Sequence, residues 1–109
     1  MKKSNYDIRY LPQFYEDLRE KVVYISKVLH NTGAANRLID SVEAAIIERM
    51  PIAESFEQVK SLKERKYPYY RIYVDNFVIY YVVIDEGNGN KIMEIRRLLY
   101  KRQNRDEII

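Results

Sequence analysis

The chain has 109 residues, of which 47% are hydrophobic and 32% charged, and its net charge is +3. This length and composition predict one globular domain, residues 1–109, whose core needs neither disulfides nor metal. The absence of cysteine excludes disulfide bridges, zinc–thiolate sites and cysteine nucleophiles. The longest apolar run, Phe77 to Ile84, is far shorter than the ~20 residues that span a bilayer, and the first residues lack the apolar stretch of a signal peptide. We therefore expect a cytoplasmic protein that does not enter a membrane.

The first half of the chain predicts a strand followed by a helical hairpin. Residues 6–10 alternate as in a short strand. Pro12 suits the first turn of a helix, and Asp17 lies near its start, where the helix dipole favours acids. After a short Asn-Thr-Gly break, a second helix runs from about Ala34 to Arg49 and is ended by Pro51. Because the link is short, the two helices must pack antiparallel.

The second half predicts three strands. An irregular segment, with a helical turn near residues 54–59, precedes the strands Tyr70–Val74 and Phe77–Ile84, which the two-residue turn Asp75-Asn76 joins as a hairpin. A third strand, Ile92–Leu99, follows a Gly-Asn loop. The order β-α-α-β-β-β predicts an α+β domain in which the helical hairpin packs on one face of a small antiparallel sheet.

The positive charge is concentrated in two stretches of the second half. Residues 60–71 hold five basic side chains and one acidic one, and residues 91–105 hold six and one. Such asymmetry indicates an anionic partner, and arginine beside tyrosine suits the binding of phosphates and bases. A solvated protein surface explains the same charge without a partner.

Strand alternation selects the side chains that could meet such a partner. It places Arg71 and Tyr73 on one face of their strand, opposite the apolar side chains that form the natural core face. On the last strand, Arg97, and then Tyr100 and Arg102 in the tail, could approach the same region. Neighbouring arginines would lower the pKa of a tyrosine there and make it a usable proton carrier.

Structural roles compete with these assignments. Arg97 could instead pair with Asp85 or Glu94, and His30 is expected to cap the first helix or lie at the surface. Four further tyrosines are expected in the core or at its rim. They are Tyr69, Tyr70, Tyr80 and Tyr81.

The stretches YRIYVDNFVIYYVVID and IMEIRRLLYKRQN, preceded by a strand and a helical hairpin, resemble the RelE/ParE superfamily of toxins from bacterial toxin–antitoxin modules. The resemblance covers nearly the whole chain. The family pattern Arg-aliphatic-aliphatic-His-Gly-Arg-Arg-Asp corresponds here to the eight residues from Arg97 to Asn104. The resemblance implies a toxin neutralised by a cognate antitoxin in a hetero-oligomer. RelE-like toxins cleave mRNA in the ribosomal decoding site, whereas ParE-like toxins inhibit DNA gyrase without hydrolysis.

For a metal-independent mRNA endoribonuclease we expect Arg71, Arg97 and Arg102 to hold the scissile phosphate. Tyr100, at the position of the family's histidine, would transfer a proton, and Tyr73 would stack on a base. Further RNA contacts are expected from Lys63, Lys66, Lys101 and Arg105. No cofactor or metal is expected, and the ribosome and mRNA would be the partners.

Two departures from the nuclease pattern keep other functions open. Val78 stands where RelE-like nucleases usually carry a basic residue, and Tyr73 stands where the best-known of them have a lysine. The alternatives are a ParE-like inhibitor of DNA gyrase and a non-toxic nucleic-acid-binding domain.

Overall fold

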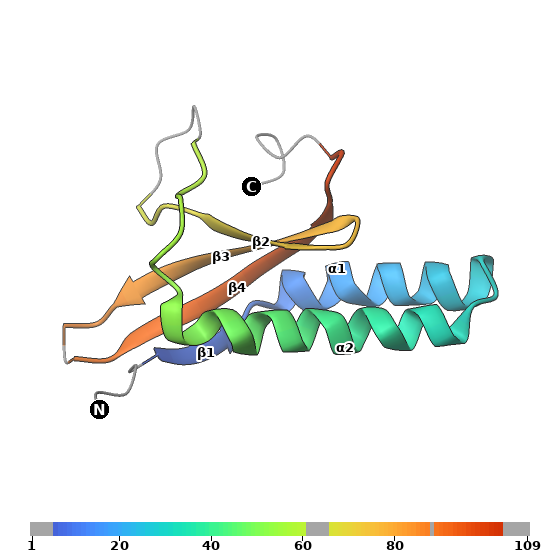
Figure 1. Ribbon diagram of the computed structural model, residues 1–109, viewed down its shortest axis with the longest axis horizontal. Helices are drawn as coiled ribbons and strands as arrows, with labels where there is room; N and C mark the ends of the chain where they lie inside the picture. Colours follow the sequence, from blue (N-terminus) through green and yellow to red (C-terminus); the bar gives the residue numbers. More distant parts are fainter. Residues whose placement is uncertain (1–5, 61–65, 88, 104–109) are drawn as a thin grey trace.

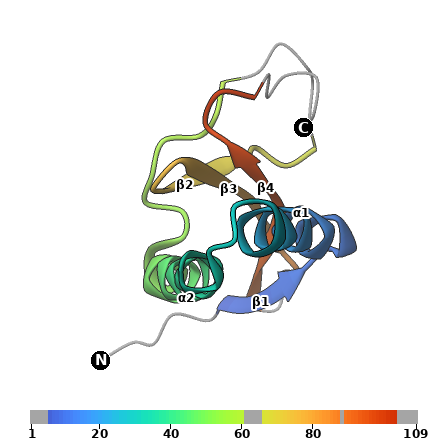
Figure 2. The ribbon, with the colours of Figure 1, turned by 90° about the vertical axis from the view of Figure 1, so that its right-hand side faces the viewer.

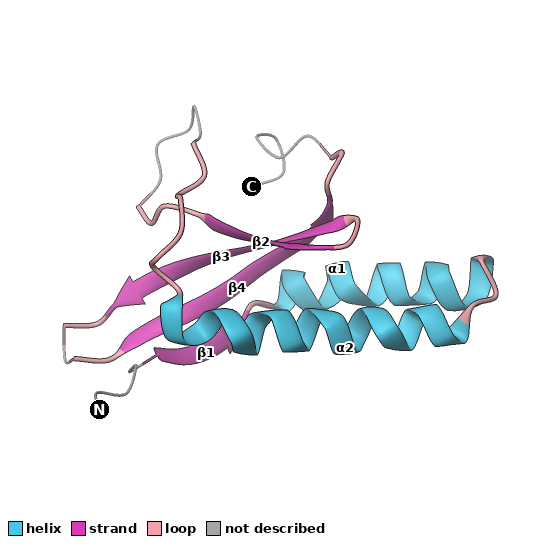
Figure 3. Ribbon diagram, in the orientation of Figure 1, coloured by secondary structure: helices cyan, strands magenta, loops and turns pink. Residues whose placement is uncertain are grey.

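The computed structural model describes residues 6–60, 66–87 and 89–103. It confirms the predicted α+β class and order of elements (Figure 3). The elements are β1 (Tyr6–Tyr10), α1 (Pro12–Val23), the π-helical turn η1 (Tyr24–Val28), α2 (Thr32–Arg49), the 3-10 turn η2 (Met50–Ile52), β2 (Tyr70–Val74), β3 (Phe77–Asp85) and β4 (Lys91–Tyr100).

The four strands form one sheet in the order β1-β4-β3-β2, and the helical hairpin lies on one face of it (Figures 1 and 2). β2, β3 and β4 pair antiparallel, as predicted, whereas β1 pairs parallel with β4. Parallel strands need a long connection, and the helices together with β2 and β3 separate β1 from β4 along the chain. The end of the hairpin extends past the β2–β3 turn (Figure 1).

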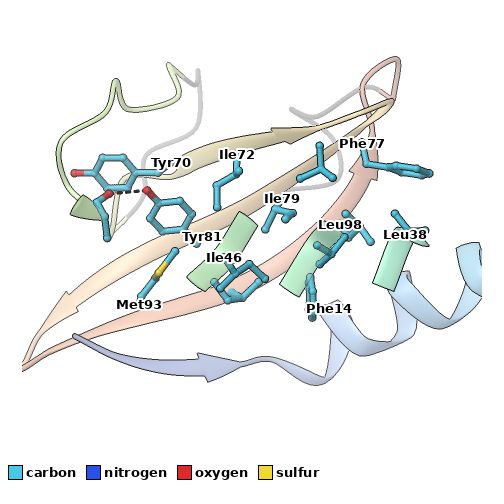
Figure 4. Packing of buried hydrophobic residues seen from close by; sticks show 14 residues of the cluster. Phe14, Leu38, Ile46, Tyr70, Ile72, Phe77, Ile79, Tyr81, Met93 and Leu98 are labelled. Carbon is cyan, nitrogen blue, oxygen red and sulfur yellow. Dashed lines mark hydrogen bonds between the residues drawn. The ribbon is translucent and has the colours of Figure 1, made fainter. Parts of the chain in front are cut away.

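The main core lies between the helices and the sheet (Figure 4). Leu38, Val42 and Ile46 recur at steps of four along α2, and with Phe14 of α1 they pack on the buried side chains of the strands. A second, smaller cluster lies on the opposite face and comprises Tyr69, Val78, Tyr80, Val82 and Leu99. β3 therefore has apolar side chains buried on both faces, which accounts for its continuous apolar run.

The element boundaries differ from the prediction at several places. α2 begins at Thr32, two residues early, because the Asn31 side chain accepts a hydrogen bond of 2.9 Å from the Ala34 N–H and caps the helix. The helical turn lies at η2, directly after α2, and not at residues 54–59. β4 includes Tyr100, which the prediction left in the tail.

Candidate nucleic-acid interface

Two cationic side chains flank one exposed aromatic ring on the sheet face that points away from the helices. Tyr73 is 54% exposed, the Arg71 guanidinium lies 5.7 Å from its ring centroid, and the Lys101 ammonium lies 5.5 Å from it. We call Arg71, Tyr73 and Lys101 the Tyr73 cluster. The structure confirms that Arg71 and Tyr73 share the face opposite the core side of β2.

Backbone pairing holds the Tyr73 cluster in place. Tyr73 lies opposite Val78 of β3, and Val78 lies opposite Leu99 of β4, so that the three side chains form one row across the sheet. Lys101 follows directly after β4, and its N–H donates a hydrogen bond of 3.0 Å to the carbonyl oxygen of Asn76 in the β2–β3 turn. The cluster is therefore carried by the sheet and a tight turn, which fix the spacing of its charges.

The Tyr73 cluster suits a nucleic acid chemically. A tyrosine ring offers a face on which a base can stack, and cations beside the ring can neutralise the flanking phosphates. The planar guanidinium of Arg71 can bind a phosphate with two parallel hydrogen bonds, whereas the Lys101 ammonium acts as a compact point charge.

Arg97 lies in one row with Arg71 across the sheet, because both pair with Tyr80 of β3, but its guanidinium is bound to Asp17 of α1. Arg97 Nε and Nη2 donate hydrogen bonds of 2.8 and 3.0 Å to the two Asp17 carboxylate oxygens, and the Leu98 N–H donates a third of 2.9 Å. Asp17 is only 2% exposed. Burial alone raises the pKa of Asp17, but these hydrogen bonds and one from Gln13 outweigh it and lower that pKa below its ordinary value.

The Asp17–Arg97 pair also corrects two smaller expectations. Asp17 lies beyond the first turn of α1 and is buried, so the helix dipole does not account for it, and the described ion pair of Arg97 is with Asp17 rather than with Asp85 or Glu94. Glu94 instead forms ion pairs with Arg9 and Arg96, at 2.6 and 2.8 Å.

Tyr100 lies on the helix side of the sheet, so the prediction that it faces the same ligand as Arg71 is wrong. It pairs with Phe77 across the strands, and the two ring centroids are 5.0 Å apart. β4 continues through Tyr100, and strand alternation then turns this residue to the face opposite Arg97. Burial raises the pKa of Tyr100, and the charges of Tyr24 and Glu20 add to the rise, so the expected lowering by arginines is also wrong.

The remaining predicted residues are scattered. Arg102 is exposed and lines a groove together with Tyr100. Lys66 is exposed, with its ammonium 5.4 Å from the ring centroid of Tyr67. Lys63 and Arg105 lie outside the described residues. The four predicted catalytic residues therefore do not surround one point, and Arg71 alone joins the Tyr73 cluster.

Sequence reasoning missed two buried polar residues of α1, Asp17 and Lys21. A signal was available, because Phe14, Asp17 and Lys21 are spaced by three and four residues, the spacing of one helix face. A carboxylate and an ammonium on the buried face of a helix require partners, and that requirement could have indicated the link to the last strand.

The described residues hold no group of three or more acidic or histidine side chains close enough to bind a metal ion. Among their helices, none combines the length and apolarity needed to cross a membrane. No protein-family model matches the chain, and comparison with the curated proteins finds no match either.

Proposed function

We propose that the protein is the toxin component of a type II toxin–antitoxin module and acts in the cytoplasm as a ribosome-dependent mRNA endoribonuclease. Two features support the module: the resemblance of the last strands to the RelE/ParE superfamily, and an order of elements that matches the one implied by that resemblance. The observation that carries the RNA assignment is the Tyr73 cluster, an exposed ring between two cations. A cognate antitoxin is the proposed partner.

In this proposal the Tyr73 cluster holds the mRNA. A base stacks on Tyr73, and Arg71 and Lys101 neutralise the phosphates on either side of it. Cleavage joins the 2′-oxygen to phosphorus and breaks the bond to the 5′-oxygen, which Lys101 can protonate as it departs. The cluster contains no carboxylate or imidazole to take the proton of the 2′-hydroxyl. Activity would therefore depend on a base supplied where the mRNA is bound, which fits dependence on the ribosome.

One observation favours inhibition of DNA gyrase as the second candidate. Arg97 is bound to Asp17, and Tyr100 faces the helices, so two of the residues expected in a nuclease site are used elsewhere. A toxin that only binds its target needs no assembled proton donor and acceptor. The Tyr73 cluster would then contact the protein target or its DNA.

The test is to induce the chain in bacteria and to map the 5′ ends of mRNA. We expect new 5′ ends within translated regions, and we expect Arg71→Ala and Tyr73→Ala to reduce them about 10-fold or more. One charge-assisted contact contributes roughly 1.5–3 kcal/mol, and one stacked base roughly 1–3 kcal/mol. Arg19→Ala, which removes an exposed arginine from α1, is the matched control and should leave cleavage unchanged. Growth arrest with intact mRNA and a DNA-damage response would instead establish the gyrase candidate. Normal growth would refute toxicity.

A further inference from the structure

A pocket of about 420 Å³ lies between the end of α2, the segment after η2 and the outer edge of β2. We call it the Phe56 pocket. Figure 2 shows the segment after η2 running beside β2. The lining includes Glu48, Arg49, Ile52, Phe56 and Tyr73. Because Tyr73 also belongs to the Tyr73 cluster, the pocket continues directly from the proposed RNA site.

Exposed apolar side chains form one part of the lining. Ile52 is 47% exposed, Phe56 42% and Tyr73 54%. Two of these three are aromatic, and an exposed aromatic ring offers a face on which a base can stack. The volume lies within the range of ~300–1,000 Å³ that is usual for small-ligand pockets. The pocket therefore has the size and the surfaces to receive a planar ring.

Arg49 forms the cationic part of the lining and is held in a fixed position. Its guanidinium carbon lies 3.4 Å from the Phe56 ring centroid, and Nη1 donates hydrogen bonds of 3.1 Å to the Arg71 carbonyl oxygen and 3.0 Å to the Tyr81 hydroxyl oxygen. Within the described part of the chain, the N–H groups of Nε and Nη2 make no hydrogen bond. These parallel donors form a fork that suits two neighbouring acceptors of a ligand.

The outer edge of β2 is open only beside Tyr73. The Val59 N–H donates a hydrogen bond of 2.7 Å to the Tyr69 carbonyl oxygen, and Arg49 occupies the carbonyl oxygen of Arg71. Strand alternation turns the N–H and C=O of Tyr73 to the same edge. One residue of open edge is too short to pair with a peptide strand, but it can contact the edge of one base.

Glu48 favours a base over a phosphate in this pocket. Its side chain is exposed, and it forms no ion pair with any residue that the structure describes. A carboxylate in the lining would repel a phosphate. The edge of a base carries N–H donors as well as acceptors, so that it can pair with both the Glu48 carboxylate and the Arg49 fork.

We propose that the Phe56 pocket receives an unpaired base of the RNA strand bound by the Tyr73 cluster, next to the base stacked on Tyr73. The base lies against Phe56, the Arg49 fork donates to its acceptors, and Glu48 accepts from its N–H groups. This inference rests on the proposed function for the binding of RNA but not for its cleavage. Since a base in a duplex is already paired and stacked, the pocket selects single-stranded RNA.

The test compares two labelled strands of about eight nucleotides, a single-stranded RNA and a strand of the same length and charge whose riboses carry no bases. Affinity is measured by fluorescence anisotropy at one fixed salt concentration, because phosphate contacts depend on salt. We expect Phe56→Ala to weaken the RNA about 5-fold or more and to leave the abasic strand unchanged, since a stacked base contributes about this much. Phe56 is exposed, so its removal should not prevent folding.

A second variant and a control locate the contact. Tyr73→Ala should also weaken the RNA, and in the double variant the two fold-changes should multiply, because the two rings hold different bases. Ile47→Ala removes an exposed apolar side chain of α2 that does not line the pocket, and it should change neither affinity. An RNA duplex of the same length should bind no better to the unaltered protein than to Phe56→Ala.

Full affinity of Phe56→Ala for the RNA would overturn the inference, and an equal loss for both strands would assign the pocket to the sugar-phosphate backbone instead. A loss in Tyr73→Ala without a loss in Phe56→Ala would retain the proposed RNA site and reject only the pocket. Binding that depends on Phe56 in a chain that cleaves no mRNA would refute the nuclease and support the pocket. Absence of RNA binding up to about 1 mM would overturn both.

Discussion

Removing the Asp17 carboxylate should destabilise the protein more than any single surface change, because it joins α1 to β4. The carboxylate accepts hydrogen bonds from Gln13 Nε2, Arg97 Nε and Nη2 and the Leu98 N–H, at 2.8 to 3.0 Å. Breaking a buried ion pair by removal of one partner costs about 3–5 kcal/mol. The Arg97 side chain is 21% exposed and can turn part of its charge to water, so we expect the lower end, about 3 kcal/mol, for Asp17→Ala.

The amide variant separates the contribution of the Asp17 charge from that of its hydrogen bond to the Leu98 N–H. Asp17→Asn keeps an oxygen that can accept the Leu98 N–H bond but loses the charge, and we expect it to cost about 2 kcal/mol. A domain of this size is stabilised by roughly 5–15 kcal/mol in total, so either loss is a large fraction.

The assay is urea denaturation followed by circular dichroism, with the slope of the transition compared between variants. Glu16→Ala is the matched control, because Glu16 is the exposed acidic neighbour on the same helix, and its removal should change stability by less than about 0.5 kcal/mol. A loss below about 1 kcal/mol for Asp17→Ala, or an equal loss for both alanine variants, would refute the reasoning.

Three further predictions concern stability. The folded-state pKa values of Asp17 and Glu94 are lowered, so their contribution to stability is complete above the ordinary carboxyl pKa near ~4 and is lost as the pH falls through the lowered values. The urea midpoint, measured over a range of acidic pH, should fall accordingly, and it should fall less in Asp17→Asn. A midpoint that rises on acidification would contradict this. Ile79 has no exposed surface, and Ile79→Ala should cost about 2–5 kcal/mol in the same urea assay, with a value under about 1 kcal/mol as the contrary result. Asp75 has a φ of +51°, a left-handed conformation that a β-branched residue adopts only with strain. Asp75→Val should therefore lower the stability of the protein by about 1–2 kcal/mol, whereas Asp75→Gly should not lower it. Equal stability of the two variants would show that the turn geometry is not the cause.

The parts of the site that were predictable are those set by neighbours in the chain. The alternation of β2 was enough to place Arg71 and Tyr73 together on the face away from the core. Lys101 was expected to contact RNA, but its approach to Tyr73 depends on the pairing of β4 with β3 and on the hydrogen bond to Asn76, which local periodicity does not reveal.

The errors have a different physical origin. The Asp17–Arg97 pair joins residues 80 positions apart, and no local pattern indicates which carboxylate reaches which arginine. Tyr100 was misplaced because the end of β4 is decided by pairing with Phe77, and one additional strand residue determines which face the ring occupies.

Short-range patterns in the chain were enough to predict the order of the elements, the apolar stripe of α2 and the turn at Asp75-Asn76, because each depends on side chains a few residues apart. Long-range packing was needed to place β1 parallel to β4, to bring Asp17 to Arg97, and to bury Lys21 beside an open groove. These features depend on how distant segments exclude water from one another, and burial and the pairing of buried charges are properties of the packed chain as a whole.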